Sequence, residues 1–282
     1  PSVAPPGMFD PRPRSQDPPE NGRASMTDTI PNIRLDSEAL SKLAEQHHTA
    51  YVEASPFPHI VLDDVFPAEW LHALLEEFPR PDAEDWKRYD RATEKKLESQ
   101  SEDRLGPRTR NMIAQLNSSA FLLFLEQLSG IEGLIPDPHL DGGGLHQIES
   151  GGRLAVHADF SRNWKLKVER RLNVLVYLNE DWEESYGGYL ELWDRSMTRA
   201  EERILPLFNR CVIFNTDSTA YHGHPDPLTC PEDRTRKSLA LYYYTVGRPK
   251  EKRSFSHSTL WRARPGESAD VTEVIQADAR AA

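Results

Sequence analysis

The sequence predicts a mainly β protein, an antiparallel sandwich or jelly roll with helices packed on its outside. Helix-type patterns fill the first part of the chain, and short apolar runs separated by turn residues follow Gly142. Several short strands at this spacing are typical of a sandwich or jelly roll. Helices first and strands afterward favour one barrel covered by N-terminal helices over two independent domains.

Three segments of the first half have apolar residues at helical spacing. They predict helices over about 37–52, from Pro67 to about 78, and over about 112–128. Residues 59–65 predict a strand between the first two helices. Further strands are expected at 145–148, 154–160, 171–178, 189–193, 211–214 and 238–245.

Residues 80–108 are dominated by charged side chains, with Trp86 and Tyr89 as exceptions. A solvated loop or a set of short surface helices is the simpler interpretation. The alternative is a lid that closes over an active site, because long loops in compact domains are often functional.

The composition divides the chain into three parts. Residues 1–30 are rich in proline and poor in large apolar residues, which predicts a disordered leader. Residues 31–262 are expected to form one domain, with its barrel core at about 140–246. Residues 263–282 are expected to be a loosely ordered tail, because apolar density falls after about Thr245.

The charge and the cysteine content exclude some classes of protein. The net charge of −11 argues against a general binder of nucleic acid or of an anionic membrane, because such binding needs a basic surface. No apolar run approaches the ~18 residues that a membrane span needs. Two cysteines are too few for a disulfide scaffold, so a reducing, cytoplasmic setting is expected.

Two residues near the end of a strand-type run are suited to bind a metal. His157 and Asp159 are two residues apart, so both side chains project from one face of a strand. A second histidine from a distant strand would complete a 2-His-1-carboxylate set, which holds Fe(II) and leaves positions for a co-substrate and O2. Spacing alone leaves two candidates for it, His222 and His224.

A basic group precedes the last long strand-type run. Arg234, Arg236 and Lys237 come directly before the apolar run Ser238–Tyr244. A guanidinium at the head of a buried strand is suited to bind a carboxylate through two parallel hydrogen bonds.

Together these motifs resemble the prolyl 4-hydroxylase-type Fe(II)/2-oxoglutarate dioxygenases. The resemblance covers about residues 140–246, with the motifs in the same order along the chain. It implies a double-stranded β-helix, the jelly-roll fold of that family. The motifs are His157-Ala158-Asp159, the run Arg171–Asn179, Gly187-Gly188-Tyr189-Leu190, Phe214 through His222, and Arg236–Tyr242.

The resemblance also implies roles for individual residues. The family's spacing selects His222 as the second histidine ligand and leaves His224 beside the ligands or in the pocket lining. It selects Arg236 over Arg234 as the residue that binds 2-oxoglutarate, and it implies that Tyr177 helps to hold the same carboxylate.

Four further residues are candidates for contacts around the ligands or the substrate. Ten residues before the first ligand, many peptidyl-prolyl hydroxylases place a tyrosine that contacts the co-substrate, and this chain has Gln147. This departure from the family leaves peptidyl-prolyl specificity open. Asn173 lies in the strand-type run that ends with Tyr177-Leu178-Asn179. Arg162 and Trp164 follow the metal motif and are expected at the entrance of the pocket.

The resemblance implies a hydroxylase that uses Fe(II), 2-oxoglutarate and O2, with ascorbate as a candidate reductant. It would attack an unactivated C–H bond and release succinate and CO2. Asp159 favours hydroxylation, because halogenating relatives have Gly or Ala there. The expected substrate is a peptidyl residue of the prolyl type, an amino acid or a small metabolite. The alternative is a non-catalytic, cupin-like metal-binding barrel, which has no need of Arg236.

Overall fold

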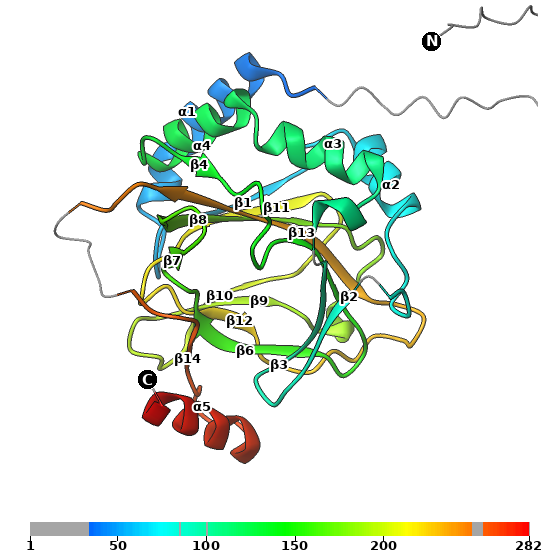
Figure 1. Ribbon diagram of the computed structural model, residues 1–282, viewed down its shortest axis with the longest axis vertical. Helices are drawn as coiled ribbons and strands as arrows, with labels where there is room; N and C mark the ends of the chain where they lie inside the picture. The colour runs from blue at the N-terminus through cyan, green and yellow to red at the C-terminus, as the bar shows by residue number, and fades with distance from the viewer. Residues whose placement is uncertain (1–33, 85, 100, 250–255, 282) are drawn as a thin grey trace, which may run out of the picture. The chain divides into compact units, whose positions relative to one another are not determined.

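The computed structural model describes residues 34–84, 86–99, 101–249 and 256–281 (Figure 1). The predicted leader, residues 1–30, lies outside the described residues. Residues 31–282 form one compact unit. Within the described part of the chain, no helix combines the length and apolar character that crossing a membrane requires.

The described strands form one antiparallel sheet that curls into a nearly closed barrel, which confirms the predicted jelly roll. Two layers face each other in Figure 1, with β1, β11, β8 and β13 in one and β10, β9, β12 and β6 in the other. Strands β5 and β3 connect the layers on one side. The strands, in sheet order, are β1 (His59–Asp63), β11 (Arg210–Asn215), β8 (Val168–Tyr177), β13 (Arg236–Thr245), β5 (Gly144–Ile148), β3 (Glu94–Ser99), β6 (Arg153–Ala158), β12 (His222–His224), β9 (Leu190–Trp193) and β10 (Ala200–Ile204).

Four short strands extend this sheet at its margins. Strand β2 (Trp86–Asp90) pairs with β3, β4 (Ile135–Pro136) with β13, β7 (Arg162–Asn163) with β8, and β14 (Leu260–Trp261) with β6. All of these pairs are antiparallel.

Four helices cover the outer face of the β1–β11–β8–β13 layer (Figure 1). They are α1 (Ser37–Val52), α2 (Ala68–Glu76), α3 (Pro107–Leu116) and α4 (Ser119–Ser129). The side chain of Asp36 caps α1 by accepting hydrogen bonds from two backbone amides of its first turn. The predicted helix at 112–128 is two helices, because Ser118 has an extended backbone between them.

Alternation along two central strands separates the core from the interior of the barrel. In β8, Leu172, Val174 and Val176 belong to the core shared with the helices. In β13, Leu239 and Leu241 do the same. Among the intervening residues, Asn173 of β8 and Arg236, Ser238 and Tyr242 of β13 line the cavity inside the barrel.

The prediction of a loop or surface helices at 80–108 is wrong for the strands at 86–90 and 94–99. Strands β2 and β3 form an antiparallel hairpin there, and β3 also pairs with β5 and β6. A short 3₁₀ helix, Glu102–Arg104, follows. Lys96 pairs with Glu94 and Glu98 in this strand. Because these charges neutralise one another, a strand whose sequence suggests a solvated segment is buried against the barrel.

The C-terminal segment differs from the expected loosely ordered tail. It contains helix α5 (Ala269–Ala281), which lies beside β14 and β6 in Figure 1. Val271 is buried, and Arg153 of β6 forms a 3.1 Å ion pair with Asp270. Arg264 of the same segment also pairs with Asp226. These contacts are made with residues distant in sequence, so the composition of the segment does not reveal them.

Candidate active site

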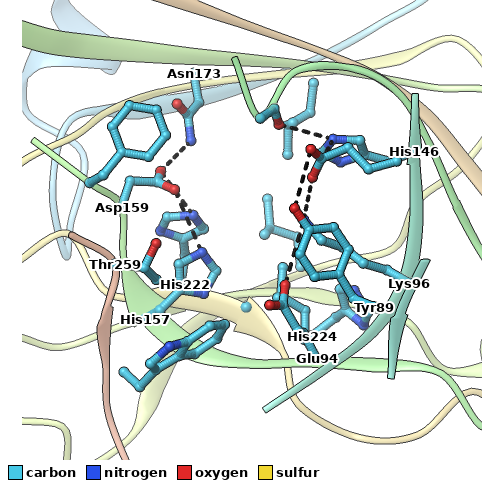
Figure 2. A pocket seen from close by; sticks show the side chains of 18 of the residues that line it. Tyr89, Glu94, Lys96, His146, His157, Asp159, Asn173, His222, His224 and Thr259 are labelled. Atoms are coloured by element: carbon cyan, nitrogen blue, oxygen red, sulfur yellow. Dashed lines mark hydrogen bonds and ion pairs between the residues drawn. The ribbon is translucent and has the colours of Figure 1, made fainter. Parts of the chain in front are cut away.

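Three side chains that could hold a metal converge inside the barrel (Figure 2). Strand β6 supplies His157, Asp159 follows the end of the same strand, and β12 supplies His222, whose Cα pairs with that of His157. One potential ligand atom from each residue lies within 4.8 Å of the other two. Asp159 Oδ1 is 3.6 Å from His157 Nε2, and Asp159 Oδ2 is 3.4 Å from His222 Nε2.

Backbone carbonyls orient both imidazoles. His157 Nδ1 is 2.9 Å from the carbonyl oxygen of Ala155, and His222 Nδ1 is 2.9 Å from that of Ala220. A carbonyl can only accept a hydrogen bond, so each Nδ1 carries a proton and each Nε2 keeps its lone pair. Both lone pairs point to the space beside the Asp159 carboxylate, so the donor set fits a divalent metal.

A polar group behind Asp159 holds its carboxylate in place and keeps it ionised. Asn173 Nδ2 donates a 2.8 Å hydrogen bond to Asp159 Oδ2, and Arg170 Nη2 lies 3.1 Å from the same oxygen. Burial alone would raise the pKa of Asp159, but Arg170 and the two imidazoles lower it well below its usual value. Burial lowers the pKa of His222 to about 4, which keeps this imidazole neutral. Both effects favour metal binding.

The Arg170 guanidinium is itself fixed on several sides. It donates to Asn173 Oδ1 from Nε at 3.0 Å and from Nη2 at 2.7 Å. It also lies over the rings of Tyr242, at 3.4 Å from the centroid, and Phe160, at 4.6 Å. Sequence reasoning missed Arg170. The available signal was an arginine pair, Arg170-Arg171, inside a strand-type run.

A second polar group forms around Arg236 at the start of β13. Its Nε donates to the carbonyl of Gly188 at 2.8 Å, and its Nη2 donates to the Tyr177 hydroxyl at 3.1 Å. A Cβ on Gly188 would lie 3.0 Å from Arg236 Cδ, and the glycine has φ +72°, so the turn requires glycine. Arg234 instead donates to the carbonyl of Glu180 and does not line the cavity.

One cavity of about 710 Å³ is lined by the metal group and by Arg236, whereas Tyr177 is fully buried beside Arg236 and does not line the cavity. Its remaining walls come from the β2–β3 hairpin and from residues 258–262. On the hairpin side, Lys96 Nζ is 3.1 Å from Glu98, and the Tyr89 hydroxyl donates to the same carboxylate at 3.4 Å. His146 lies 4.0 Å from Glu98. Figure 2 shows this hairpin wall facing the metal group across the cavity.

Strand β14 brings the C-terminal segment to the metal group. The Trp261 ring lies 5.1 Å from the His157 ring, and Thr259 lines the cavity near the ligands in Figure 2. The apolar pair Leu260-Trp261 was the only signal for this contact in the sequence, and two residues are too few to predict a strand.

Of the other predicted site residues, one lines the cavity and three do not. His224 lines the cavity. Gln147 faces away from it, because its amide donates to the carbonyl of Pro79 and accepts from Thr235, and the adjacent His146 takes the inward position. Neither Arg162 nor Trp164 lines the cavity, and the Trp164 side chain is 70% exposed.

An antiparallel barrel with two histidines and one carboxylate on an inner face is the architecture of non-haem iron oxygenases. Residues 143–244 match the model of the 2OG-Fe(II) oxygenase superfamily. The matched residues include all three potential metal ligands and Arg236.

Individual relatives are distant. Mouse prolyl 3-hydroxylase OGFOD1 is 24% identical to this chain over 203 residues. The match covers 70% of this chain and 34% of the relative, so the chain spans about a third of the relative's length. A Pseudomonas putida prolyl-4-hydroxylase structure has a TM-score of 0.51 at 19% identity, covering 75% of this chain and 100% of that one. A prolyl hydroxylase from Trichoplax adhaerens, in complex with a hypoxia inducible factor peptide, has a TM-score of 0.53 at 16% identity, covering 73% and 91%. The structural matches show the shared fold.

Proposed function

We propose that this protein is an Fe(II)- and 2-oxoglutarate-dependent dioxygenase that hydroxylates an unactivated C–H bond and releases succinate and CO2. The observation that carries the proposal is the presence of two complementary groups in one cavity. His157, Asp159 and His222 form a metal-binding face, and Arg236 with Tyr177 forms a carboxylate-binding group.

In this proposal, Fe(II) is held by the Nε2 atoms of His157 and His222 and by the Asp159 carboxylate. When bound, the metal supplies the activation of O2. The protein's part is to fix the ligands before the metal arrives. Asn173 and Arg170 hold the carboxylate, and the Nδ1 hydrogen bonds hold the two imidazoles.

Arg236 is proposed to bind the carboxylate of 2-oxoglutarate that lies away from the metal. Two of its nitrogens are held by Gly188 and Tyr177, which leaves Nη1 to donate to a ligand. An ion pair in such a buried site is strong because little water competes with it. The cupin-like alternative gives no reason for a buried guanidinium here, and the superfamily match does not favour it.

The cavity suggests the kind of substrate. Its volume of about 710 Å³ holds 2-oxoglutarate together with one further residue-sized group. The relatives named as prolyl hydroxylases support a peptidyl, prolyl-type residue. The hairpin wall carries Lys87, Tyr89 and Lys96 together with Glu94 and Glu98, which supports a substrate with polar groups, either peptidyl or a small metabolite.

Succinate formation tests the proposal. The full chain, supplied with Fe(II), 2-oxoglutarate, O2 and ascorbate as reductant, is screened with proline-containing peptides and free amino acids. Asp159→Ala should abolish succinate formation, because it removes one ligand and leaves the two imidazoles without their charged partner. Asp82→Ala, at an exposed carboxylate paired only with Arg80, is the control and should retain activity. Equal turnover by Asp159→Ala and the wild type would contradict the proposal.

Arg236→Ala should raise the 2-oxoglutarate concentration that half-maximal turnover requires. Arg234→Ala is the matched control, because this arginine lies two residues away and bonds the carbonyl of Glu180 outside the cavity. An increase in both variants, or in neither, would remove the co-substrate role from Arg236.

A further inference from the structure

His224 is buried in the cavity with no hydrogen-bond partner on either ring nitrogen among the described residues. Only 3% of the residue is exposed. Buried polar groups are almost always hydrogen-bonded, because an unpartnered one loses its contacts with water without replacement. An imidazole left in this state is therefore expected to meet a polar group of a bound molecule.

The sheet places His224 next to the Arg236 group. Strand β12 pairs with β9 in the register His222–Leu192 and Gly223–Glu191. His224 follows Gly223 in the same strand, and Leu190, two residues from Gly188, lines the same cavity. The Gly188 carbonyl is the one that holds Arg236 Nε. His224 and Arg236 line the same cavity.

Arg236 and His224 bring donors to the same cavity. Arg236 retains Nη1 after its contacts with Gly188 and Tyr177. The Tyr177 hydroxyl accepts from Arg236 and holds the guanidinium in place, although Tyr177 is fully buried and does not line the cavity. A neutral His224 adds one N–H in either tautomer. These two donors match the two oxygens of a carboxylate.

We propose that His224 binds the distal carboxylate of 2-oxoglutarate together with Arg236, which Tyr177 holds in place. This inference rests on the proposed function and adds a residue to its co-substrate site. It also separates the two histidines that sequence spacing left equivalent: His222 faces Asp159 as a metal ligand, and His224 faces the co-substrate.

The test compares two ligands on the full chain loaded with Mn(II), which stands in for Fe(II) without turnover. Isothermal titration calorimetry measures the dissociation constants of 2-oxoglutarate and of 2-oxopentanoate, which has a methyl group in place of the distal carboxylate. The proteins are the wild type, His224→Val, His224→Gln and Arg236→Ala. His224→Val should weaken 2-oxoglutarate binding roughly 10- to 100-fold, as expected for a lost hydrogen bond to a charged group.

The same variant should leave the affinities for 2-oxopentanoate and for Mn(II) unchanged, and His224→Gln, which keeps a donor, should recover most of the loss. Unchanged 2-oxoglutarate affinity in His224→Val would overturn the inference. Equal weakening of both ligands, or weakened Mn(II) binding, would also overturn it, because His224 would then act on the metal or on the shape of the cavity. Failure of the wild type to bind 2-oxoglutarate would instead overturn the proposed function.

Discussion

At the scale of single residues, Asp159 owes its chemistry to groups that are not ligands. Its carboxylate lies in a buried site, where an isolated charge is costly. Arg170 supplies the opposite charge and Asn173 supplies a directed hydrogen bond, so the carboxylate stays ionised and in one orientation. Metal affinity should therefore depend on residues that never contact the metal.

Asn173→Ala is expected to weaken Mn(II) or anaerobic Fe(II) binding by roughly 10- to 100-fold. The change removes the hydrogen bond to Asp159 and releases Arg170 from its contact with the Asn173 carbonyl oxygen. Metal titration of the purified protein measures the effect.

Asn209→Ala is the control for that experiment. It also removes buried hydrogen bonds, to the backbone of Phe66, but it lies away from the ligands. It should lower thermal stability and leave metal affinity unchanged. If the two variants bind metal equally well, Asn173 does not position the carboxylate.

At the scale of elements, the β2–β3 hairpin is a wall of the cavity and not a detached lid. Its inner strand is hydrogen-bonded to both β5 and β6. Glu98 is 4% exposed, binds Lys96 and Tyr89 within the hairpin, and lies 4.0 Å from His146 of β5. We expect the stability of this hairpin wall to depend on the carboxylate of Glu98.

Glu98→Gln should lower the free energy of unfolding by about 3 kcal/mol, because it leaves the largely buried Lys96 without its closest counter-charge. Urea unfolding measures the change. Glu94→Gln is the matched variant on the same face of the strand. The carboxylate of Glu94 is 3.8 Å from Arg91 and 3.9 Å from Lys96, so its removal should cost clearly less. Equal losses of unfolding free energy in the two variants would mean that the 3.1 Å contact between Lys96 and Glu98 stabilises the protein no more than the longer contacts of Glu94.

At the scale of the whole molecule, three buried histidines, His146, His222 and His224, link stability to pH because burial lowers the pKa of each. Burial lowers the pKa values of His146 and His222 to about 4, whereas both should be near 6.5 in the unfolded chain. The unfolded state therefore binds more protons between these values, and the free energy of unfolding rises with pH across this range.

The metal-free protein should lose about 2 kcal/mol of stability per histidine between pH 7 and pH 5. Urea unfolding in the presence of a chelator at the two pH values measures this loss. His146→Asn should reduce the loss, and His139→Asn, at an exposed position, should not. A loss of equal size in all three proteins would assign the pH dependence to other groups.

The sequence was most informative where alternation and burial coincide. The sequence predicts strands at the positions of β6, β8 and β13. Each has an apolar face that packs against the helices or in another core cluster. His157 and Asp159 followed from the same alternation. The choice between His222 and His224 did not, because both face inward and only the pairing partners of β12 distinguish them.

The elements that were missed are those whose inward residues are charged. Glu94, Lys96 and Glu98 alternate correctly for a strand, but their partners are each other and His146, which no hydrophobic pattern records. Arg170 and Trp261 were missed for a related reason. Each is explained by contacts with residues distant in sequence, Asp159 for one and His157 for the other.

Strand β14 also affects how this protein behaves beside other copies of itself. It pairs with Ala158 and His157 at the end of β6, where the backbone would otherwise present unpaired amides and carbonyls. Exposed strand edges of this kind promote edge-to-edge association. A chain ending at residue 249 should therefore self-associate more than the full chain, as measured by light scattering. Asp270→Ala, which removes only the ion pair between α5 and Arg153, should stay close to the full chain. Leu260 and Trp261, which line the cavity beside the metal ligands, would thus also protect the barrel from aggregation.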